Sequence, residues 1–391
     1  MSSNSFTSDV VIVGAGLVGA SLARALARSD LELALIEPAP PSPPSEDWDS
    51  RIYALSPASQ AFLERIGAWE AMDSARLGPV RAMKIAGDRG AELGFSAYDS
   101  GVERLATIVE SGRVQHALWT LLAGQGNLRR HAPARPVSAQ FQPDAVVLTL
   151  DDGSVLRTRL LVGADGARSW VRETAGIAAK DGSFGQLGVV ANFSCERPHH
   201  DTAFQWFRDD GILAYLPLPG NRISIVWSTP EVNARELLAL DPVAFCGRVA
   251  AAGSNALGAL ELLTRPAAFP LESLSTAALI ADRVALVGDA AHGVHPLAGQ
   301  GVNLGFGDSE ALAAVLSARG PLRDAGDALL LHRYGRRRAE AILAMRVATT
   351  GLNRLFSAQI PGLARVRNAG LALTERLPVL KNLLVRHALA N

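Results

Sequence analysis

The sequence has few cysteines, no excess of either charge and no long apolar run without interruption. Its 391 residues include only Cys195 and Cys246, which stand far apart, so neither a disulfide framework nor a zinc site is expected. Lysine plus arginine number 38, as do aspartate plus glutamate, which argues against a nucleic-acid partner. Two lone cysteines fit a reducing cytoplasm, and each is expected to be a small buried apolar residue.

Membrane-spanning and metal-binding features are also scarce. The apolar run at residues 10–23 is shorter than the roughly 20 residues of a membrane span, and three glycines interrupt it. The residues before it carry no positive charge, which argues against a secretory signal. The pair His199-His200 lacks partner ligands, so a loop is expected there rather than a metal site. The chain is 48% hydrophobic and long enough for two intertwined domains.

Glycines are plentiful, and the first group has a specific spacing. A strand, a glycine turn, a helix and a second strand are predicted over residues 10–36, and the second strand ends at Glu37. Gly14, Gly16 and Gly19 form G-x-G-x-x-G in the turn. These glycines permit a tight turn, the approach of a pyrophosphate and close helix packing, while the acid is placed to bind a ribose. The pattern favours dinucleotide binding without separating FAD from NAD.

A second glycine-rich segment lies near residue 300. An apolar strand at 284–287 is followed by Asp289, a glycine loop and a helical pattern from Asn303. A carboxylate at the end of a buried strand accepts hydrogen bonds from hydroxyls, and a helix N-terminus beyond it favours negative charge. Taken alone, this segment is also compatible with an ordinary surface loop between a strand and a helix.

Two arginines and a third glycine segment complete the pattern. Arg51 follows a proline-rich stretch and is interpreted as a phosphate or ribityl contact rather than a solvated loop charge. Arg113, near the start of a predicted helix, is a second such candidate, although an exposed helix charge explains it equally well. The segment 159–169 repeats the order of buried strand, carboxylate (Asp165) and glycine.

The three segments, in this order, resemble those of the single-component FAD-dependent aromatic monooxygenases (group A) related to para-hydroxybenzoate hydroxylase. The chain is more similar still to the ubiquinone-biosynthesis hydroxylases within that family. The similarity covers nearly the whole chain and extends to six further stretches, at residues 51–56, 108–110, 214–219, 224–227, 268–271 and 351–356.

The resemblance implies an α/β fold with α+β elements. It implies a discontinuous Rossmann-like FAD-binding domain, an inserted β-sheet domain for the substrate, and a helical C-terminal region. The expected ranges are 1–75, 102–180 and 272–325 for the first, 76–101 and 181–271 for the second, and 326–391 for the third. The strands of 191–227 are expected to roof the substrate pocket, with most of their aromatic residues in the core.

The resemblance also implies roles for single residues. The glycines of the first turn and Glu37 hold the ADP half of FAD, and Arg51 and Arg113 follow its pyrophosphate and ribityl chain. Asp165 is associated with FAD and with reduced nicotinamide, and Asp289 with the ribityl–pyrophosphate region. The loop beside the flavin ring comprises Pro296, Gly299, Gln300, Gly301, Val302 and Asn303. No catalytic side chain and no metal are expected.

The chain departs from the family at two places in this region. Gly307 stands where arginine is common, and Gly293 stands where threonine is frequent. His292 and His295 lie beside the flavin loop, where packing or capping is at least as good an explanation as catalysis. The departures concern loop contacts and not the class of protein.

The implied activity is hydroxylation of the aromatic ring of a polyprenylated phenol or quinone precursor in ubiquinone biosynthesis, by way of a flavin C4a-hydroperoxide formed with O2. NADH or NADPH would supply electrons and would bind only transiently, since no second G-x-G-x-x-G is present, or a separate redox protein would supply them. Two alternatives stay open. One is the same chemistry on another apolar phenol or alkene, and the other is a non-catalytic flavoprotein subunit of a quinone-synthesis complex. A homo-oligomer is also left open.

The C-terminal part is basic. Residues 319–391 hold 13 lysines and arginines against four acids, at helical spacing. Such a surface suits a peripheral location on the inner face of a membrane, where a prenylated substrate resides. A solvated basic face or a protein–protein surface explains the pattern equally well. The run Arg336-Arg337-Arg338 is expected to lie apart from all three cofactor segments.

Overall fold

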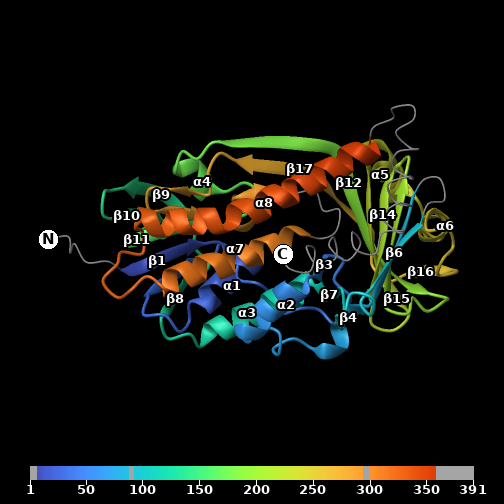
Figure 1. Ribbon diagram of the computed structural model, residues 1–391, viewed down its shortest axis with the longest axis horizontal. Coiled ribbons are helices and arrows are strands. Elements are labelled where there is room, and N and C mark those ends of the chain that lie inside the picture. The colour runs from blue at the N-terminus through green and yellow to red at the C-terminus, as the bar shows by residue number, and fades with distance from the viewer. Residues whose placement is uncertain (1–6, 88–91, 294–299, 358–391) are drawn as a thin grey trace.

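The computed structural model describes residues 7–87, 92–293 and 300–357, with side chains for residues 301–347 of the last range. Two large sheets and one small sheet form the body of the molecule, with helices packed around them (Figure 1). The α/β class and mixed sheets predicted from the sequence are confirmed. The boundaries of the three predicted domains stay predictions.

The first sheet carries the dinucleotide pattern. Its order is β18-β19-β11-β1-β2-β8, and the pairs that join β19, β11, β1, β2 and β8 are all parallel. The strands β2 and β19 and residues 10–13 of β1 are continuous apolar runs because both faces of the sheet are covered there. The bounds of the strands in this order are β1 Ser8–Val13, β2 Leu33–Ile36, β8 Leu128–His131, β11 Val155–Gly163, β18 Ile280–Ala281 and β19 Val284–Leu286.

Helices cover one face of this sheet and a hairpin covers the other. The helical face is packed by α1 (Leu17–Ala25), α2 (Pro57–Arg65), α3 (Ser111–Ala123), α7 (Gln300–Ser317) and α8 (Ala328–Ser357). The opposite face is packed by β9 (Pro136–Phe141), β10 (Val146–Leu150) and the short α4 (Trp170–Thr174). The sequence pattern placed the start of the helix after the second glycine loop at Asn303, whereas α7 begins at Gln300.

The second sheet has the order β20-β17-β12-β15-β14-β13-β5-β6, with β16 paired to β12. All of its pairs are antiparallel except β13 with β5. The strands are β5 Ala82–Ala86, β6 Glu92–Ser96, β12 Ala179–Cys195, β13 Thr202–Arg208, β14 Gly211–Leu218, β15 Arg222–Pro230, β16 Leu260–Leu262, β17 Ala267–Thr276 and β20 His292–Gly293.

One face of the second sheet forms a separate core under α5 (Glu231–Ala239) and α6 (Pro242–Ala252). Trp206, Tyr215 and Trp227 are buried there, as the sequence predicted for most of the aromatic residues. Cys195 belongs to the same core, and burial raises the pKa of its thiol to about 12. Cys246 is only half-buried, which corrects the expectation of a fully buried residue.

A small sheet joins the two large ones. It consists of β3 (Ile52–Leu55), β7 (Ala106–Glu110) and β4 (Gly78–Val80), and the 3-10 turn η1 (Ser74–Arg76) leads into β4. Glu110 at the end of β7 is buried and accepts hydrogen bonds from Arg76 and Arg113. This carboxylate therefore fastens the small sheet to the start of α3.

Helix α8 crosses the molecule from the first sheet toward the second (Figure 1). Tyr334 on this helix is buried, and its hydroxyl donates to the carbonyl oxygen of Leu286 at 2.7 Å. Arg346 donates to Ser275 of β17 at 2.7 Å. Among the helices of the described residues, none is long and apolar enough to cross a membrane.

Candidate active site

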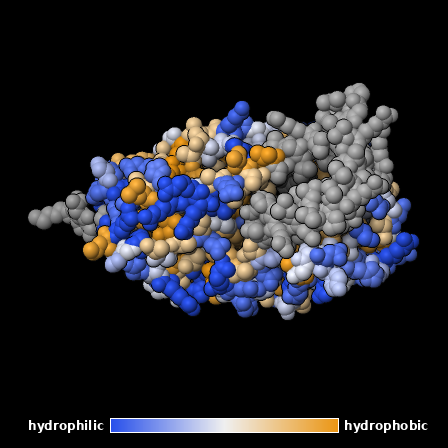
Figure 2. Space-filling model, viewed as in Figure 1, coloured by the Kyte–Doolittle hydropathy of each residue, from blue (hydrophilic) through white to orange (hydrophobic). Residues whose placement is uncertain are grey.

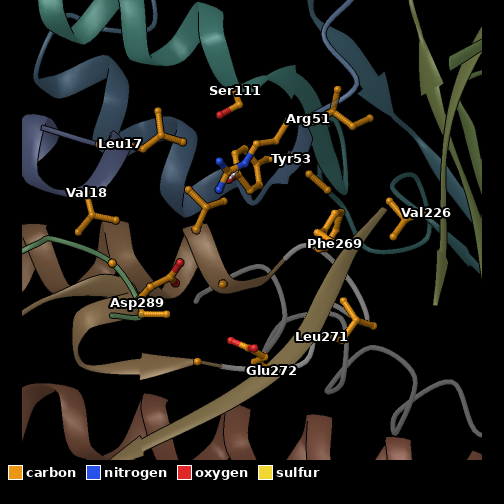
Figure 3. A pocket seen from close by; sticks show the side chains of 18 of the residues that line it. Leu17, Val18, Arg51, Tyr53, Ser111, Val226, Phe269, Leu271, Glu272 and Asp289 are labelled. Carbon is orange, nitrogen blue, oxygen red and sulfur yellow. Dashed lines mark hydrogen bonds between the residues drawn. The ribbon is translucent and has the colours of Figure 1, made fainter. Parts of the chain in front are cut away.

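A cavity of about 1810 Å³ lies where the first sheet, the small sheet and the second sheet meet. A site for one small ligand typically measures about 300–1,000 Å³. The cavity is therefore large enough for a dinucleotide and a second molecule. Figure 3 shows part of its lining, with residues from α1, from the turn η2 (Gly288–Ala290), from the small sheet and from the second sheet around one space.

The glycine turn closes one end of the cavity. Gly14 has φ +100°, and a Cβ atom added there would lie 2.4 Å from the carbonyl oxygen of Ala164. A Cβ on Gly19 would lie 1.9 Å from the carbonyl oxygen of Gly14, so α1 can pack here only with glycine. Gly16 lines the cavity, and a Cβ added there would meet nothing within 4 Å.

The first turn of α1 is open to a ligand. Gly16 is the N-cap residue and supplies no side-chain hydrogen bond to the N–H groups that follow. Unsatisfied N–H groups at a helix N-terminus attract an anion. Together with the open space at Gly16, this arrangement fits the pyrophosphate of the dinucleotide that the sequence predicts.

Glu37 follows β2 and lines the same end of the cavity. Its Oε2 accepts from the backbone N–H of Ala15 at 2.6 Å, and its Oε1 accepts from that of Ala39 at 3.1 Å. A carboxylate has about four acceptor positions, so two remain for ribose hydroxyls. The backbone contacts fix the direction of the side chain.

Asp289 lies in the 3-10 turn η2 (Gly288–Ala290) and lines the cavity, to which its side chain is exposed. Its side chain faces the cavity, across from Arg51 and Tyr53 (Figure 3), and makes no hydrogen bond to a residue that the structure describes. Burial raises the pKa of this carboxyl group. The electrostatic interactions with His292 and Arg51 lower the pKa, but they do not cancel the effect of burial. Hydroxyl groups of a ligand would relieve this desolvation by donating hydrogen bonds.

Arg51 and Tyr53 stand together in the middle of the cavity (Figure 3). Arg51 Nε donates to the hydroxyl oxygen of Tyr53 at 3.0 Å. The guanidinium group keeps donors free for phosphate or ribityl oxygens, because this bond uses one of its five N–H groups. The sequence-predicted Arg51 is therefore brought into the cavity.

Arg113 is not brought to the cavity wall. Its Nε donates to Glu110 at 2.9 Å, and its terminal nitrogen donates to the carbonyl oxygen of Ser45 at 3.1 Å. The side chains of α3 that do line the cavity are Ser111 and Gln115, which share one face of the helix. The role predicted for Arg113 has no support from its position.

Asp165 lines the cavity but already has partners. Its two carboxylate oxygens accept from the Ser169 hydroxyl at 2.5 Å and from the Val171 N–H at 3.1 Å, at the start of α4. Burial raises the pKa of Asp165, and these hydrogen bonds oppose the shift. The carboxylate holds the turn after β11 in place, and its predicted contact with reduced nicotinamide stays a prediction.

The start of α7 contributes Gly301 and Val302 to the cavity lining. Asn303 instead links elements, because its Oδ1 accepts from Ser56 N–H at 3.0 Å and its Nδ2 donates to Ala54 O at 2.9 Å. Pro296, Gly299 and His295 fall outside the described residues, and Gln300 is described only as the first residue of α7.

A buried charge network behind Asp289 was not foreseen. Asp308 on α7 is fully buried and pairs with His292 at 2.6 Å and with Arg338 of α8 at 2.7 Å. It also accepts from the N–H of Gly288 at 2.9 Å. Burial alone would raise the pKa of Asp308, but His292 and Arg338 hold it below its usual range.

Arg338 fits because residue 307 is glycine. A Cβ on Gly307 would lie 2.8 Å from a terminal nitrogen of Arg338, which also donates to the carbonyl oxygen of Leu304. The expectation that the run 336–338 lies apart from the cofactor segments is therefore wrong for Arg338. Arg336 and Arg337 are exposed. No spacing in the sequence links position 338 to Asp308.

His199 is a buried structural residue rather than a free loop side chain. Its Nε2 lies 2.9 Å from Leu218 O and 2.7 Å from Gly220 O, so Nε2 carries the proton and donates to both carbonyls. Nδ1 accepts from the N–H of Asp201 at 3.1 Å. The next two residues, His200 and Asp201, have positive φ angles, so this ring stabilises a strained turn.

We expect His199→Ala to lower the free energy of unfolding by about 1–3 kcal/mol, because it leaves two carbonyl groups and one N–H without their partner. FAD content should stay normal, since His199 does not line the cavity. Denaturant titration and flavin absorbance test both points. The control is His200→Ala, which removes an exposed ring, and an equal loss in both variants would contradict the assignment.

The second sheet supplies the other half of the cavity. The cavity-lining residues on β5, on β13 to β15 and on residues 187–195 of β12, here called the sheet wall, are almost all apolar, whereas Asp181, Gly182 and Ser183 line the cavity from the other end of β12. The residues of the sheet wall are Met83, Val190, Ala203, Phe204, Gln205, Ile212, Ala214, Leu216, Val226 and Ser228. Phe269 and Leu271 of β17 continue this surface toward the centre (Figure 3). This half is suited to an apolar molecule.

Comparison with known proteins agrees with this geometry. A family model described as an FAD binding domain matches residues 7–348. The chain is 35% identical over 384 residues to 3-demethoxyubiquinol 3-hydroxylase of Escherichia coli (strain K12), across 97% of this chain and 98% of that protein. It is 36% identical over 385 residues to ubiquinone hydroxylase UbiL of Rhodospirillum rubrum, across 97% and 89%.

Solved structures show the same fold. P. aeruginosa PqsL in complex with 2-aminobenzoylacetate matches with a TM-score of 0.79 at 26% identity, over 93% of this chain and 99% of that chain. The p-nitrophenol 4-monooxygenase PnpA from Pseudomonas putida DLL-E4 matches with a TM-score of 0.78 at 19% identity, over 98% of each chain.

Proposed function

This chain belongs to the FAD-binding family of aromatic monooxygenases, in the branch of the ubiquinone-biosynthesis hydroxylases, and we propose that it hydroxylates the ring of a prenylated phenol or hydroquinone precursor of ubiquinone. The observation that carries the proposal is the single continuous cavity. One end has the glycines and carboxylates of a dinucleotide site, and the other is the apolar sheet wall. A nonpolar ring can therefore be held next to the cofactor.

We assign the cofactor contacts as follows. The N–H groups at the start of α1 and the Arg51 guanidinium bind the pyrophosphate, and Glu37 binds the ribose of the adenosine half. Asp289 accepts from ribityl hydroxyls, while Gly301 and Val302 lie beside the flavin ring. FAD, once reduced, supplies the activation of O2 and the transfer of one oxygen atom to the ring.

The protein's own contribution is to orient the ring and to exclude water. Val190, Ala214, Val226 and Phe269 offer no hydrogen bonds to solvent, so a bound ring displaces water from this half of the cavity. Water exclusion favours transfer of oxygen to the ring over release of hydrogen peroxide. Arg51 and Tyr53 supply polar groups where the two halves meet.

The test is a coupled assay with purified protein and FAD. The substrate is a demethoxyubiquinol with a short prenyl tail, offered with NADH, NADPH or a reduced redox protein in turn. We expect O2 consumption that depends on the substrate, and a product that gains one oxygen atom on the ring by mass spectrometry. O2 consumption without any hydroxylated product would contradict the proposal, and a flavin that never reacts would favour the non-catalytic subunit.

We also propose that the protein rests on the inner face of an anionic membrane through α8. The exposed side of this helix combines Arg333, Arg336 and Arg337 with Leu329 and Leu343. Figure 2 shows hydrophilic and hydrophobic residues interspersed along its course. A basic helix with exposed apolar side chains binds anionic headgroups at a bilayer surface. The lysine and arginine residues beyond residue 357 lie outside the described residues.

We expect the triple change of Arg333, Arg336 and Arg337 to glutamine to weaken binding to anionic vesicles by about 1 kcal/mol per charge. Arg338 must stay, because it holds Asp308. High salt should weaken binding of the unchanged protein as well, since exposed charges are screened over about 8 Å at physiological ionic strength. Vesicle co-sedimentation at two salt concentrations measures both effects, and FAD content serves as the control. Vesicle binding that changes neither with salt concentration nor with the triple substitution would refute the proposal.

A further inference from the structure

Gln205 is one of two polar side chains in the sheet wall, and it is 6% exposed. The other is Ser228, at 4%. An amide placed among apolar side chains is unfavourable unless it finds hydrogen-bond partners. Its presence in this wall therefore needs a physical explanation.

The strand register gives the direction of the Gln205 side chain. Gln205 pairs with Ala214, which pairs with Val226, and Val226 pairs with Val190, so these four form one row across the sheet. All four line the cavity. The following residue, Trp206, lies in the core on the opposite face, as side chains alternate along a strand.

The Gln205 amide has no internal partner. Its side chain makes no hydrogen bond to any residue in the described ranges, although nine-tenths of the residue is buried. By contrast, Asn192, which is also buried on this sheet, donates to the carbonyl oxygen of Asp49 at 2.9 Å. The Gln205 amide is therefore available to a molecule inside the cavity.

We propose that the Gln205 amide binds oxygen substituents of the aromatic substrate and so sets which ring carbon faces the flavin. An amide has an acceptor oxygen and two N–H donors on one flat group. It can accept from a ring hydroxyl and donate to a neighbouring ether oxygen, so it fits a phenol with an adjacent alkoxy group. The assignment rests on the proposed function, because it requires an aromatic substrate in the apolar half.

The test combines Gln205→Met with a change in the substrate. Methionine keeps the length and volume of the side chain and removes both hydrogen-bonding functions. The two substrates are a short-tailed methoxy-substituted quinol and its analogue in which the methoxy oxygen is replaced by CH2. We expect Gln205→Met to lower kcat/KM about tenfold for the first and less than threefold for the second. In this variant, the fraction of consumed O2 that appears in hydroxylated product should fall only with the methoxy-substituted quinol.

FAD affinity, the matched variant Ser228→Ala and the activity of the unchanged protein serve as controls. FAD affinity of Gln205→Met should equal that of the unchanged protein, and a loss would mean that the amide binds the flavin instead. Ser228→Ala, the matched change in the same wall, should treat the two substrates alike. An equal penalty on both substrates in Gln205→Met would overturn the assignment and mean that the amide holds only water. If the unchanged protein hydroxylates neither substrate, the proposed function fails rather than the role of Gln205.

Discussion

Replacement of Asp308 by alanine is expected to destabilise the protein by about 3–5 kcal/mol, because it leaves the Arg338 guanidinium buried without its carboxylate. Arg338 is 11% exposed and Asp308 is fully buried, so water cannot replace the lost partner. His292 and the N–H of Gly288 lose an acceptor in the same step. Thermal or denaturant unfolding of the FAD-free protein measures the loss.

The matched control removes a carboxylate from an exposed ion pair. Glu231 and Arg235 pair on α5 with more than half of each side chain exposed, so Glu231→Ala should cost no more than about 1 kcal/mol. FAD binding should also weaken in Asp308→Ala, since Gly288 precedes Asp289 in the cavity wall. A loss of stability no greater than that of the control would show that the buried pair contributes little.

Replacement of Asp289 by alanine is expected to weaken FAD binding without lowering the stability of the FAD-free protein. The loss of charge-assisted hydrogen bonds to FAD costs about 1.5–3 kcal/mol, or about ten- to a hundredfold in affinity. The FAD-free protein should be as stable as before or more so. Burial raises the pKa of Asp289, which means that the folded protein disfavours its charged form at neutral pH.

Flavin titration by fluorescence quenching gives the affinity, and unfolding without FAD gives the stability. His199→Ala is the complementary variant, with reduced stability and normal affinity. Equal FAD occupancy in Asp289→Ala and His199→Ala would remove Asp289 from the set of cofactor contacts. The three variants together separate a cofactor ligand, a support of the cofactor loop and a structural histidine.

The parts of the site that could be predicted are those encoded locally. The turn of Gly14, Gly16 and Gly19 was found because the three glycines stand at a fixed short spacing between a predicted strand and a predicted helix. Asp289 was found because it directly follows a buried apolar strand. Arg51 was singled out by its place after the proline-rich stretch and then by the resemblance, and it lines the cavity.

The parts that were missed depend on packing between distant segments. Helical spacing could not tell whether Arg113 turns toward the cavity or toward Glu110, since both lie near the start of α3. The face of β13 that carries Gln205 follows from the register of four strands, and a shift by one residue would reverse it. Glycine has a low helix propensity, so the glycine-rich sequence at 301–307 suggested a helix start later than Gln300. Packing of α7 against α1 overrides this low helix propensity.

The contact between Gly307 and Arg338 also limits how parts of this protein can be exchanged. A hybrid that takes α7 from a relative with arginine at position 307 would bring a second guanidinium group into the space that Arg338 already occupies. A hybrid that takes α8 without an arginine at position 338 would leave Asp308 without its cation. Positions 307 and 338 should therefore be transplanted as a pair, and libraries that vary them jointly should yield functional combinations that single substitutions do not reach.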